Sequence, residues 1–207
     1  MKKIALFGGS GRTGFQFLQR AVAAGYTVRC LVRNPAKLNF AHPAVEVLKG
    51  DVLDYDDVLR TVSGTDIVVS LFGHVKNSPS DVQTEGTRHI VQAMKATNVQ
   101  RIISLSGGGL PFPEKDQPGF ISGVMKLLMP QVLKDAEGHY KVLRESGLEW
   151  MVARGPRLTD GPHTGKYRVG WVGVNSGIKI SRADLADFIL KQVENTTYTF
   201  QMPFVTS

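Results

Sequence analysis

The sequence has only one cysteine, Cys30, among its 207 residues. A lone cysteine excludes an internal disulfide bond and a cysteine-rich zinc site. The sequence also lacks an apolar run close to the ~20 residues that a bilayer-spanning helix needs. No long apolar segment of the signal-peptide kind precedes the first strand-like run. We therefore expect a soluble, cytoplasmic protein without a membrane partner.

Clustered positive charge is also missing, although the formal net charge is +7 at pH 7. The basic residues are dispersed, with no interleaved aromatic platform, so we do not expect a nucleic-acid partner. The histidines His74, His89 and His139 lack metal-ligand spacing, and we expect no metal site. The excess of positive charge fits an anionic small-molecule ligand instead.

Apolar runs alternate with helical patterns along the chain. Strand-like runs occupy residues 4–7, 27–32, 45–48, 66–71, 101–105 and 148–153. Helical spacing of apolar residues occupies residues 15–22, 54–62, 81–97, 131–146 and 183–193. This alternation predicts the α/β class, as a single Rossmann-like, doubly wound parallel β-sheet with helices on both faces. We expect one domain over residues 1–207, with a substrate site formed by its C-terminal third.

Local signals predict some helix ends and loops. Asp54 and Ser181 are expected to cap helices, and Gly147 is expected to end one. Residues 111–119 form a proline-rich segment long enough to be a flap or a wall of the substrate site. Residues 121–129 are apolar and either cover that site or belong to the core. Residues near 165–169 predict an additional strand.

A glycine-rich turn joins the first strand-like run to the first helix. Gly8 permits a tight turn, Gly11 lets backbone approach a pyrophosphate closely, and Gly14 allows the helix to pack tightly on the sheet. The amides and the dipole of that helix then face the anion. The predicted phosphate-binding residues are Gly8, Ser10, Gly11, Arg12, Thr13 and Gly14. The alternative is a glycine turn that binds no ligand.

Arg33 stands at the end of the second strand, where NAD-binding folds usually carry a carboxylate for the adenosine ribose. A carboxylate repels a 2′-phosphate, whereas a guanidinium can hold it with two hydrogen bonds. We therefore predict NADP(H) rather than NAD(H) as the cofactor, with Arg12 reaching the same phosphate. The alternative for Arg33 is a solvated charge at a strand end.

The ends of the third and fourth strands complete the predicted cofactor site. Asp51 and Val52 are expected beside the adenine, with the carboxylate accepting a hydrogen bond from the adenine amino group. Cofactors lie outside the carboxyl ends of parallel strands, so Leu71, Phe72 and Gly73 are expected along the ribose and nicotinamide path. Phe72 is equally well explained as an ordinary core residue.

Several stretches resemble one known family. The matching stretches are residues 3–14, 31–33, 50–53, 139–148 and 164–167. Over nearly the whole chain, the sequence is similar to the biliverdin-IXβ reductases, also called NADPH-dependent flavin reductases. These are atypical short-chain dehydrogenases with NmrA-like NAD(P)H-binding domains. The resemblance implies a single Rossmann domain, NADPH, and hydride transfer to flavins, tetrapyrroles or quinone-like acceptors.

The resemblance also assigns residues at the ends of the fifth and sixth strands. Ser106 matches the family's serine, which would hydrogen-bond the nicotinamide carboxamide or orient the acceptor; the alternative is a serine of a strand-end turn. Arg154 and Pro156, at the end of the sixth strand, are our own predicted cofactor contacts. Standard short-chain dehydrogenases use Tyr-x-x-x-Lys, with the tyrosine as general acid. Here Tyr140 lies far beyond Ser106 and is followed four residues later by Arg144, so we interpret Tyr140 as structural.

Arg157 stands where members of the family carry a histidine. We expect Arg157 to bind an acidic acceptor, or else only to pair with Asp160 or Asp116 at the surface. With Ser106, it makes up the predicted catalytic pair.

Together these features favour an NADPH-dependent reductase that transfers hydride to a small-molecule acceptor such as a flavin, a quinone or a tetrapyrrole. The alternative is a non-catalytic NADP-binding module of the NmrA-like type that reports redox state to a partner, and the missing Tyr/Lys pair motivates it. In either case we expect a monomer or a homodimer.

Overall fold

The strand β1 (Lys3–Phe7) lies inside the main β-sheet of the computed structural model, which describes residues 2–117, 129–174 and 176–207. The four residues after Lys3 are buried. β1 pairs in parallel with β2 (Thr27–Val32) on one side and with β4 (Ile67–Ser70) on the other. Burial on both faces explains why this strand is continuously apolar instead of alternating.

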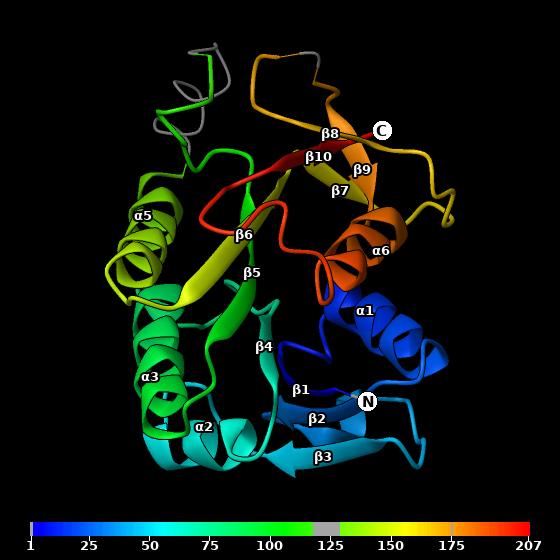
Figure 1. Cartoon of the computed structure of the whole chain (residues 1–207), viewed down its shortest axis with the longest axis vertical. Coiled ribbons are helices and arrows are strands. Elements are labelled where there is room, and N and C mark those ends of the chain that lie inside the picture. Colours follow the sequence, from blue (N-terminus) through cyan, green and yellow to red (C-terminus); the bar gives the residue numbers. More distant parts are fainter. Residues whose placement is uncertain (1, 118–128, 175) are drawn as a thin grey trace.

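The main sheet has the strand order β3-β2-β1-β4-β5-β6-β10-β8 (Figure 1). Its other strands are β3 (Val45–Lys49), β5 (Arg101–Gly107), β6 (Glu149–Gly155), β8 (Arg168–Gly170) and β10 (Phe204–Thr206). Neighbouring strands are parallel except β8 and β10, which run antiparallel at one edge. The predicted doubly wound parallel sheet is confirmed. The strand order reverses between β1 and β4, and such a reversal opens a crevice at the carboxyl ends of the strands.

Helices cover both faces of this sheet, as predicted. On one face lie α1 (Arg12–Ala23) and α6 (Arg182–Lys191), which pack against each other. On the other face lie α2 (Tyr55–Val62), α3 (Val82–Ala96) and α5 (Pro130–Arg144) (Figure 1). Each face has its own cluster of buried apolar side chains, so the sheet separates two cores.

Two predicted helix caps are confirmed, and one predicted helix end is two residues too late. The side chain of Asp54 accepts hydrogen bonds from two backbone N–H groups in the first turn of α2. Ser181 accepts one from the N–H of Asp184 at the start of α6. α5 ends at Arg144 with Glu145 as its C-cap, so Gly147 stands two residues after the cap and does not end the helix directly. Its φ of +75° is a left-handed conformation in which glycine avoids the cost of a Cβ, and it turns the chain toward β6. These ends follow from local chemistry alone.

Short strands were missed by the sequence interpretation. β10 adds to the edge of β6, and β7 (Arg157–Thr159) pairs in parallel with β9 (Lys179–Ser181) in a separate two-stranded sheet. Each has only three residues, too few for an apolar pattern to be recognised. The additional strand predicted near residues 165–169 exists as β8, but it begins at Arg168.

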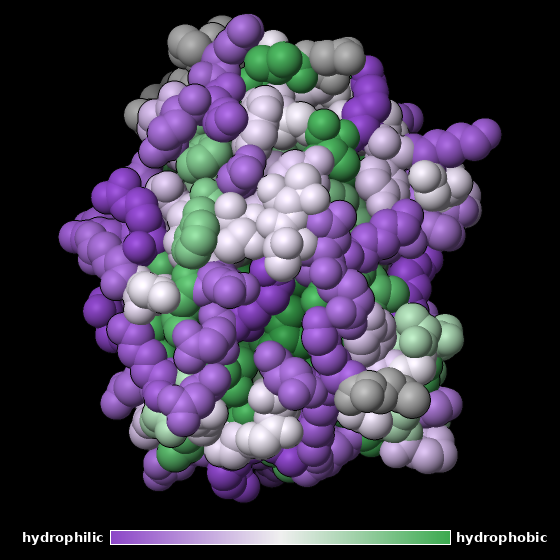
Figure 2. All heavy atoms as spheres, viewed as in Figure 1, coloured by the Kyte–Doolittle hydropathy of each residue, from purple (hydrophilic) through white to green (hydrophobic). Residues whose placement is uncertain are grey.

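The face of the molecule in Figure 2 is mostly hydrophilic, with hydrophobic atoms visible in a hollow near its centre and at scattered points around it. Among the described residues, no helix combines the length and apolar character needed to cross a membrane. Most of the apolar segment predicted at residues 121–129 lies outside the described residues.

A buried histidine joins α5 to the sheet. Nε2 of His139 lies 2.8 Å from Oγ of Ser104 on β5. One turn earlier on α5, the carboxylate of Asp135 accepts hydrogen bonds from the backbone N–H groups of Gln83 and Thr84 at the start of α3. Burial lowers the pKa of His139 to about 4, although the nearby charge of Asp135 opposes this shift. His139 is therefore a neutral structural residue at neutral pH.

Mild acid should destabilise the protein through His139. An unfolded histidine has a pKa of about 6.5, so between that value and about 4 the unfolded chain binds a proton that the folded chain does not. Neutral His139 therefore makes its full contribution to the free energy of unfolding above about pH 6.5. This contribution is lost as the pH falls from about 6.5 toward about 4. We expect the free energy of unfolding in urea to fall by about 2 kcal/mol between about pH 7.5 and about pH 5.

The variant His139→Gln cannot titrate at this position, so it should lose less stability over the same pH interval, whatever its stability at the upper pH. Substitution of the exposed His42 by Gln serves as the control and should retain the wild-type pH dependence. An identical pH dependence in His139→Gln and the wild type would contradict this account.

Candidate cofactor site

The turn after β1 is closed by backbone contacts. Gly11 donates its N–H to the carbonyl of Gly8 at 2.9 Å. Gly8 has φ +84°, and a Cβ there would lie 2.5 Å from the backbone nitrogen of Phe72. A Cβ on Gly14 would collide with the Gly8 carbonyl. Gly14 therefore lets α1 approach the turn itself, whereas the glycine spacing predicts close packing of the helix on the sheet.

Cys30 lies beneath this turn. A Cβ on Gly9 would collide with the Cys30 sulfur, so the turn passes directly over the thiol. Burial raises the pKa of the thiol to about 12, against an opposing hydrogen bond from the Gly9 backbone. Cys30 therefore acts as a small buried side chain.

Helix α1 begins without a side-chain cap. Its N-cap residue is Gly11, and its first turn contains no acidic residue. By contrast, Asp54 caps α2 and Ser181 caps α6, and both of those helices have an acidic residue in their first turn. The first amides of α1, on Arg12 and Thr13, and the positive end of the helix dipole are therefore left for an anion.

A cavity of about 630 Å³ lies beside this turn, at the carboxyl ends of the central strands. Most of the predicted cofactor residues line it, namely Gly8, Ser10, Gly11, Arg33, Asp51, Val52, Leu71, Phe72 and Gly73. Thr13 and Gly14 are buried in the first turn of α1. Two lysines outside the predicted set, Lys37 and Lys76, also line the cavity. Lys37 stands four residues after Arg33, and this spacing in the sequence could have indicated that the two cations lie in the same site.

Asp51 and Phe72 are each positioned by contacts with neighbouring residues of the chain. Oδ1 of Asp51 accepts a hydrogen bond from the backbone N–H of Leu53 at 3.0 Å, and Oδ2 bonds to no described residue. Phe72 lines the cavity and also packs on α3, where a Cβ on Gly86 would lie 2.8 Å from the ring. Phe72 therefore belongs to both the cavity wall and the core, so its two interpretations are compatible.

Arg12 lines a second, smaller cavity of about 360 Å³. Its Nη1 lies 3.2 Å from Oδ2 of Asp160, and Nη1 of Arg182 lies 2.6 Å from the other oxygen of that carboxylate. The residues that line both cavities are Ser10, Gly11 and Lys37. Arg12 and Arg33, which were predicted to share one phosphate, thus line adjoining cavities, and the partners of Arg12 were not foreseen.

Arg154 was predicted to contact the cofactor, but the structure places it in the core. Its side chain is fully buried and forms two hydrogen bonds with the carboxylate of Asp116, at 2.6 and 2.8 Å. It also donates to the carbonyls of Leu110 and Met202. Arg154 lines neither of the two cavities described above. The same ion pair ties residues 111–117 of the predicted flap to β6, and the rest of that segment lies outside the described residues.

Ser106 lies in register beside Arg154, at the carboxyl end of β5. It is buried, and its hydroxyl has no hydrogen-bond partner among the described residues. Ser104, two residues earlier, points toward α5, so Ser106 faces the same side of the sheet. Ser106 lines neither of the two cavities described above, so its role toward the carboxamide or the acceptor stays a prediction.

Pro156 and Arg157 line neither of these cavities. Pro156 is half-buried between β6 and β7, and Arg157 is exposed at the start of β7. Arg157 makes no ion pair with a described residue. The two aspartates named as its alternative partners pair with other arginines. Its predicted role in binding an acceptor stays a prediction.

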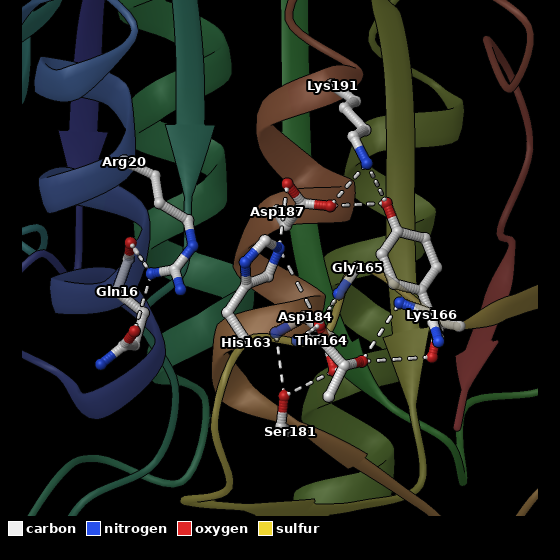
Figure 3. A network of polar contacts seen from close by, with 11 residues as sticks. Gln16, Arg20, His163, Thr164, Gly165, Lys166, Ser181, Asp184, Asp187 and Lys191 are labelled. Atoms are coloured by element: carbon white, nitrogen blue, oxygen red, sulfur yellow. Dashed lines mark hydrogen bonds and ion pairs between the residues drawn. The ribbon is translucent and has the colours of Figure 1, made fainter.

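The family-like stretch at residues 164–167 is fixed to α6. The carboxylate of Asp184 accepts hydrogen bonds from the backbone N–H groups of Thr164 and Gly165 and from the hydroxyls of Thr164 and Ser181 (Figure 3). Burial raises the pKa of Asp184, but these hydrogen bonds outweigh it and hold the pKa below its ordinary value. This stretch therefore has a structural role in positioning the segment after β7.

A comparison with known protein families agrees with this geometry. A model described as NAD(P)H-binding matches residues 8–196. The chain belongs to this NAD(P)H-binding family. Its Rossmann-like fold and its oxidoreductase-like relatives agree with that assignment, whereas the narrower resemblance to biliverdin-IXβ and flavin reductases stays a prediction.

Curated relatives include proteins with and without a named activity. The chain is 25% identical to the uncharacterized protein YwnB of Bacillus subtilis, over 93% of this chain and 92% of the relative. It is 23% identical to the photosystem II assembly factor Ycf39 of Cyanophora paradoxa, over 94% of this chain and 62% of the relative. It is 32% identical to a phenylcoumaran benzylic ether reductase of Populus trichocarpa, over 48% of this chain and 33% of the relative. The chain thus spans only part of the length of the last two.

Solved structures with the same fold include two bacterial proteins. The oxidoreductase ylbE of Lactococcus lactis is 20% identical, with a TM-score of 0.82 over 99% of this chain and 90% of its own. A short-chain dehydrogenase/reductase of Veillonella parvula, in complex with NADP, is 18% identical, with a TM-score of 0.78 over 100% of this chain and 94% of its own. At these identities the likeness establishes the fold.

The substitution Gly14→Ala should disrupt the cofactor turn, because its Cβ would collide with the Gly8 carbonyl. We expect the free energy of unfolding to fall by about 1–3 kcal/mol, as in other overpacked sites, and NADPH binding to be lost. Urea unfolding and a fluorescence titration with NADPH measure the two effects. Gly170→Ala is a matched control, because a Cβ there would make only ordinary contact, at 3.6 Å. Wild-type binding by Gly14→Ala would show that the turn is not part of the site.

Proposed function

We propose that this protein is an NADPH-dependent reductase of flat, conjugated acceptors such as flavins, quinones or tetrapyrroles. The observation that carries the proposal is the uncapped start of α1, which opens beside a cavity lined by Arg33 and Lys37. The residues fit a dinucleotide, because free helix amides suit a diphosphate and the cavity volume of about 630 Å³ is in the range of ligand sites.

The cations after β2 favour NADP(H) over NAD(H). Arg33 and Lys37 are both exposed, line the same cavity, and form no ion pair with a described residue. Both charges are therefore free for a phosphate dianion, which forms stronger hydrogen bonds with a guanidinium than a neutral ribose hydroxyl does. An acidic residue that would bind the ribose of NAD is missing from the end of β2.

Tyr140 and Tyr167, the tyrosines of the family-like stretches, line neither cavity and are poor general acids. Tyr140 on α5 packs edge-on against Trp150, with ring centroids 5.5 Å apart, and burial raises its pKa. The hydroxyl of Tyr167 does lie 3.1 Å from a lysine, Lys191, but it also donates to Asp187, and burial raises its pKa too. A general acid in this superfamily needs a lowered pKa. Because the pKa values of both tyrosines are raised, we favour a reaction in which no tyrosine donates the proton.

Conjugated acceptors suit a site without a strong acid. The reduced nicotinamide, when bound, supplies a hydride, and a proton from solvent completes the two-electron reduction of the acceptor. Close positioning of the two rings then supplies most of the acceleration. Within this scheme Ser106 orients the carboxamide or the acceptor, and Arg157 offers its unpaired charge to an acidic acceptor. The reductases and dehydrogenases among the relatives favour this reading over a non-catalytic module.

The direct test is oxidation of NADPH with a panel of flavin mononucleotide and soluble quinones, followed by the absorbance of the reduced nicotinamide. We expect turnover with at least one acceptor, and faster turnover with NADPH than with NADH. Tight binding of NADPH without turnover on any acceptor would contradict the reductase and favour a binding module.

Replacing Arg33 by Ala should weaken NADPH binding by about 1.5–3 kcal/mol, the range for a hydrogen bond to a charged group, and leave NADH binding nearly unchanged. Calorimetric titration with both nucleotides measures this difference. Lys95→Ala is the charge-matched control, because Lys95 is exposed in the last turn of α3 and lines neither cavity. Equal losses for the two nucleotides would rule out Arg33 as the phosphate-binding residue.

Replacing Ser106 by Ala should lower turnover about tenfold, the effect of one lost hydrogen bond, with little change in NADPH affinity. The stability of the protein should not fall, because the hydroxyl that is removed has no partner among the described residues. Steady-state kinetics and urea unfolding separate the two effects. If turnover stays at the wild-type level, Ser106 has no part in catalysis.

A further inference from the structure

We propose that Asp160 competes with the 2′-phosphate of NADP(H) for Arg12, and so sets how strongly the protein prefers NADPH over NADH. This inference rests on the proposed function of the cofactor cavity. Asp160 lies 148 positions from Arg12 in the sequence, yet its Oδ2 is 3.2 Å from Nη1 of that arginine. It brings a negative charge to the start of α1, where an anionic ligand is expected.

The carboxylate of Asp160 is held in position independently of Arg12. The preceding residue, Thr159, pairs with Ser181 in the small β7–β9 sheet. A few residues later, the chain is bound again by the hydrogen bonds between Thr164 and Asp184 (Figure 3). Between these two anchors, Nη1 of Arg182 lies 2.6 Å from Oδ1 of Asp160. Asp160 therefore keeps its place and a counter-charge when Arg12 leaves.

The contact of Asp160 with Arg12 is the weaker of its two ion pairs. The side chain of Arg12 is 72% exposed, whereas that of Arg182 is only 12% exposed. Exposed ion pairs contribute little, because solvent screens the charges and both side chains lose freedom. A phosphate dianion offers a guanidinium two charges and several acceptor oxygens. We infer from this comparison that the phosphate displaces Asp160 from Arg12 at a small but measurable cost.

The two cavities adjoin where this exchange would take place. Ser10 and Gly11 of the cofactor turn line both of them, and so does Lys37. Arg12 is the first residue of α1, so its backbone is fixed by the turn while its exposed side chain is free to reorient. The competition therefore involves the movement of one side chain and needs no change in the fold.

The test is a calorimetric comparison of NADPH and NADH binding in four variants: Asp160→Asn, Arg12→Ala, the double variant, and Glu145→Gln. Glu145 is exposed after α5 and is the charge-matched control. We expect Asp160→Asn to bind NADPH about two- to fivefold more tightly, which is the weight of an exposed ion pair, with a smaller change for NADH. The effect should shrink at high ionic strength, since it is electrostatic. In the Arg12→Ala background, Asp160→Asn should have no further effect.

Unchanged or weaker NADPH binding by Asp160→Asn would overturn the competition. The same gain with and without Arg12 would also overturn it, because Asp160 would then act on the ligand directly. Both outcomes leave the proposed function intact as long as the wild type binds NADPH and Arg33→Ala weakens it. If the wild-type protein binds neither nucleotide, the proposed function itself is wrong.

Discussion

The backbone carbonyl of Gly8 fixes the arrangement of β1, the glycine turn and α1, which together border the cofactor cavity. It accepts the hydrogen bond that closes the turn and lies against Gly14, so it fixes how near α1 comes to β1. Gly8 itself abuts the end of β4, which places the cavity wall of Leu71 and Phe72 beside the helix start. One tight backbone contact thus sets the direction of the free amides and the edge of the cavity that they face.

The C-terminal half is built in another way. Its strands β7 to β10 have three residues each, and buried charged groups hold its segments in place. Asp184 gathers the chain after β7 onto α6, and the pair of Arg154 with Asp116 ties a loop to β6. Buried charges need complete sets of partners, so these segments have little freedom to rearrange. The C-terminal half therefore forms a rigid frame around the end of β6.

The sequence was informative where the chemistry is local. The apolar run of β1, the glycine spacing and Arg33 all lie within about thirty residues, and their interpretation rests on rules of turns and strand ends. Arg154 was misassigned because its partner Asp116 stands 38 positions earlier, and no local pattern links the two. The Arg12–Asp160 contact was missed for the same reason. Three-residue strands such as β10 owe their existence to neighbours in the sheet, so their own sequence carries almost no signal.

The placement of Cys30 under the cofactor turn has a consequence for chemical resistance. A thiol with a pKa of about 12 is almost entirely protonated at neutral pH, and thiolate is the form that peroxides and electrophiles attack. Cys30 is fully buried and Gly9 lies against its sulfur, so the thiol is shielded from reagents in solvent. Oxidants in solution would therefore leave Cys30 in its thiol form, and the turn above it would keep its shape.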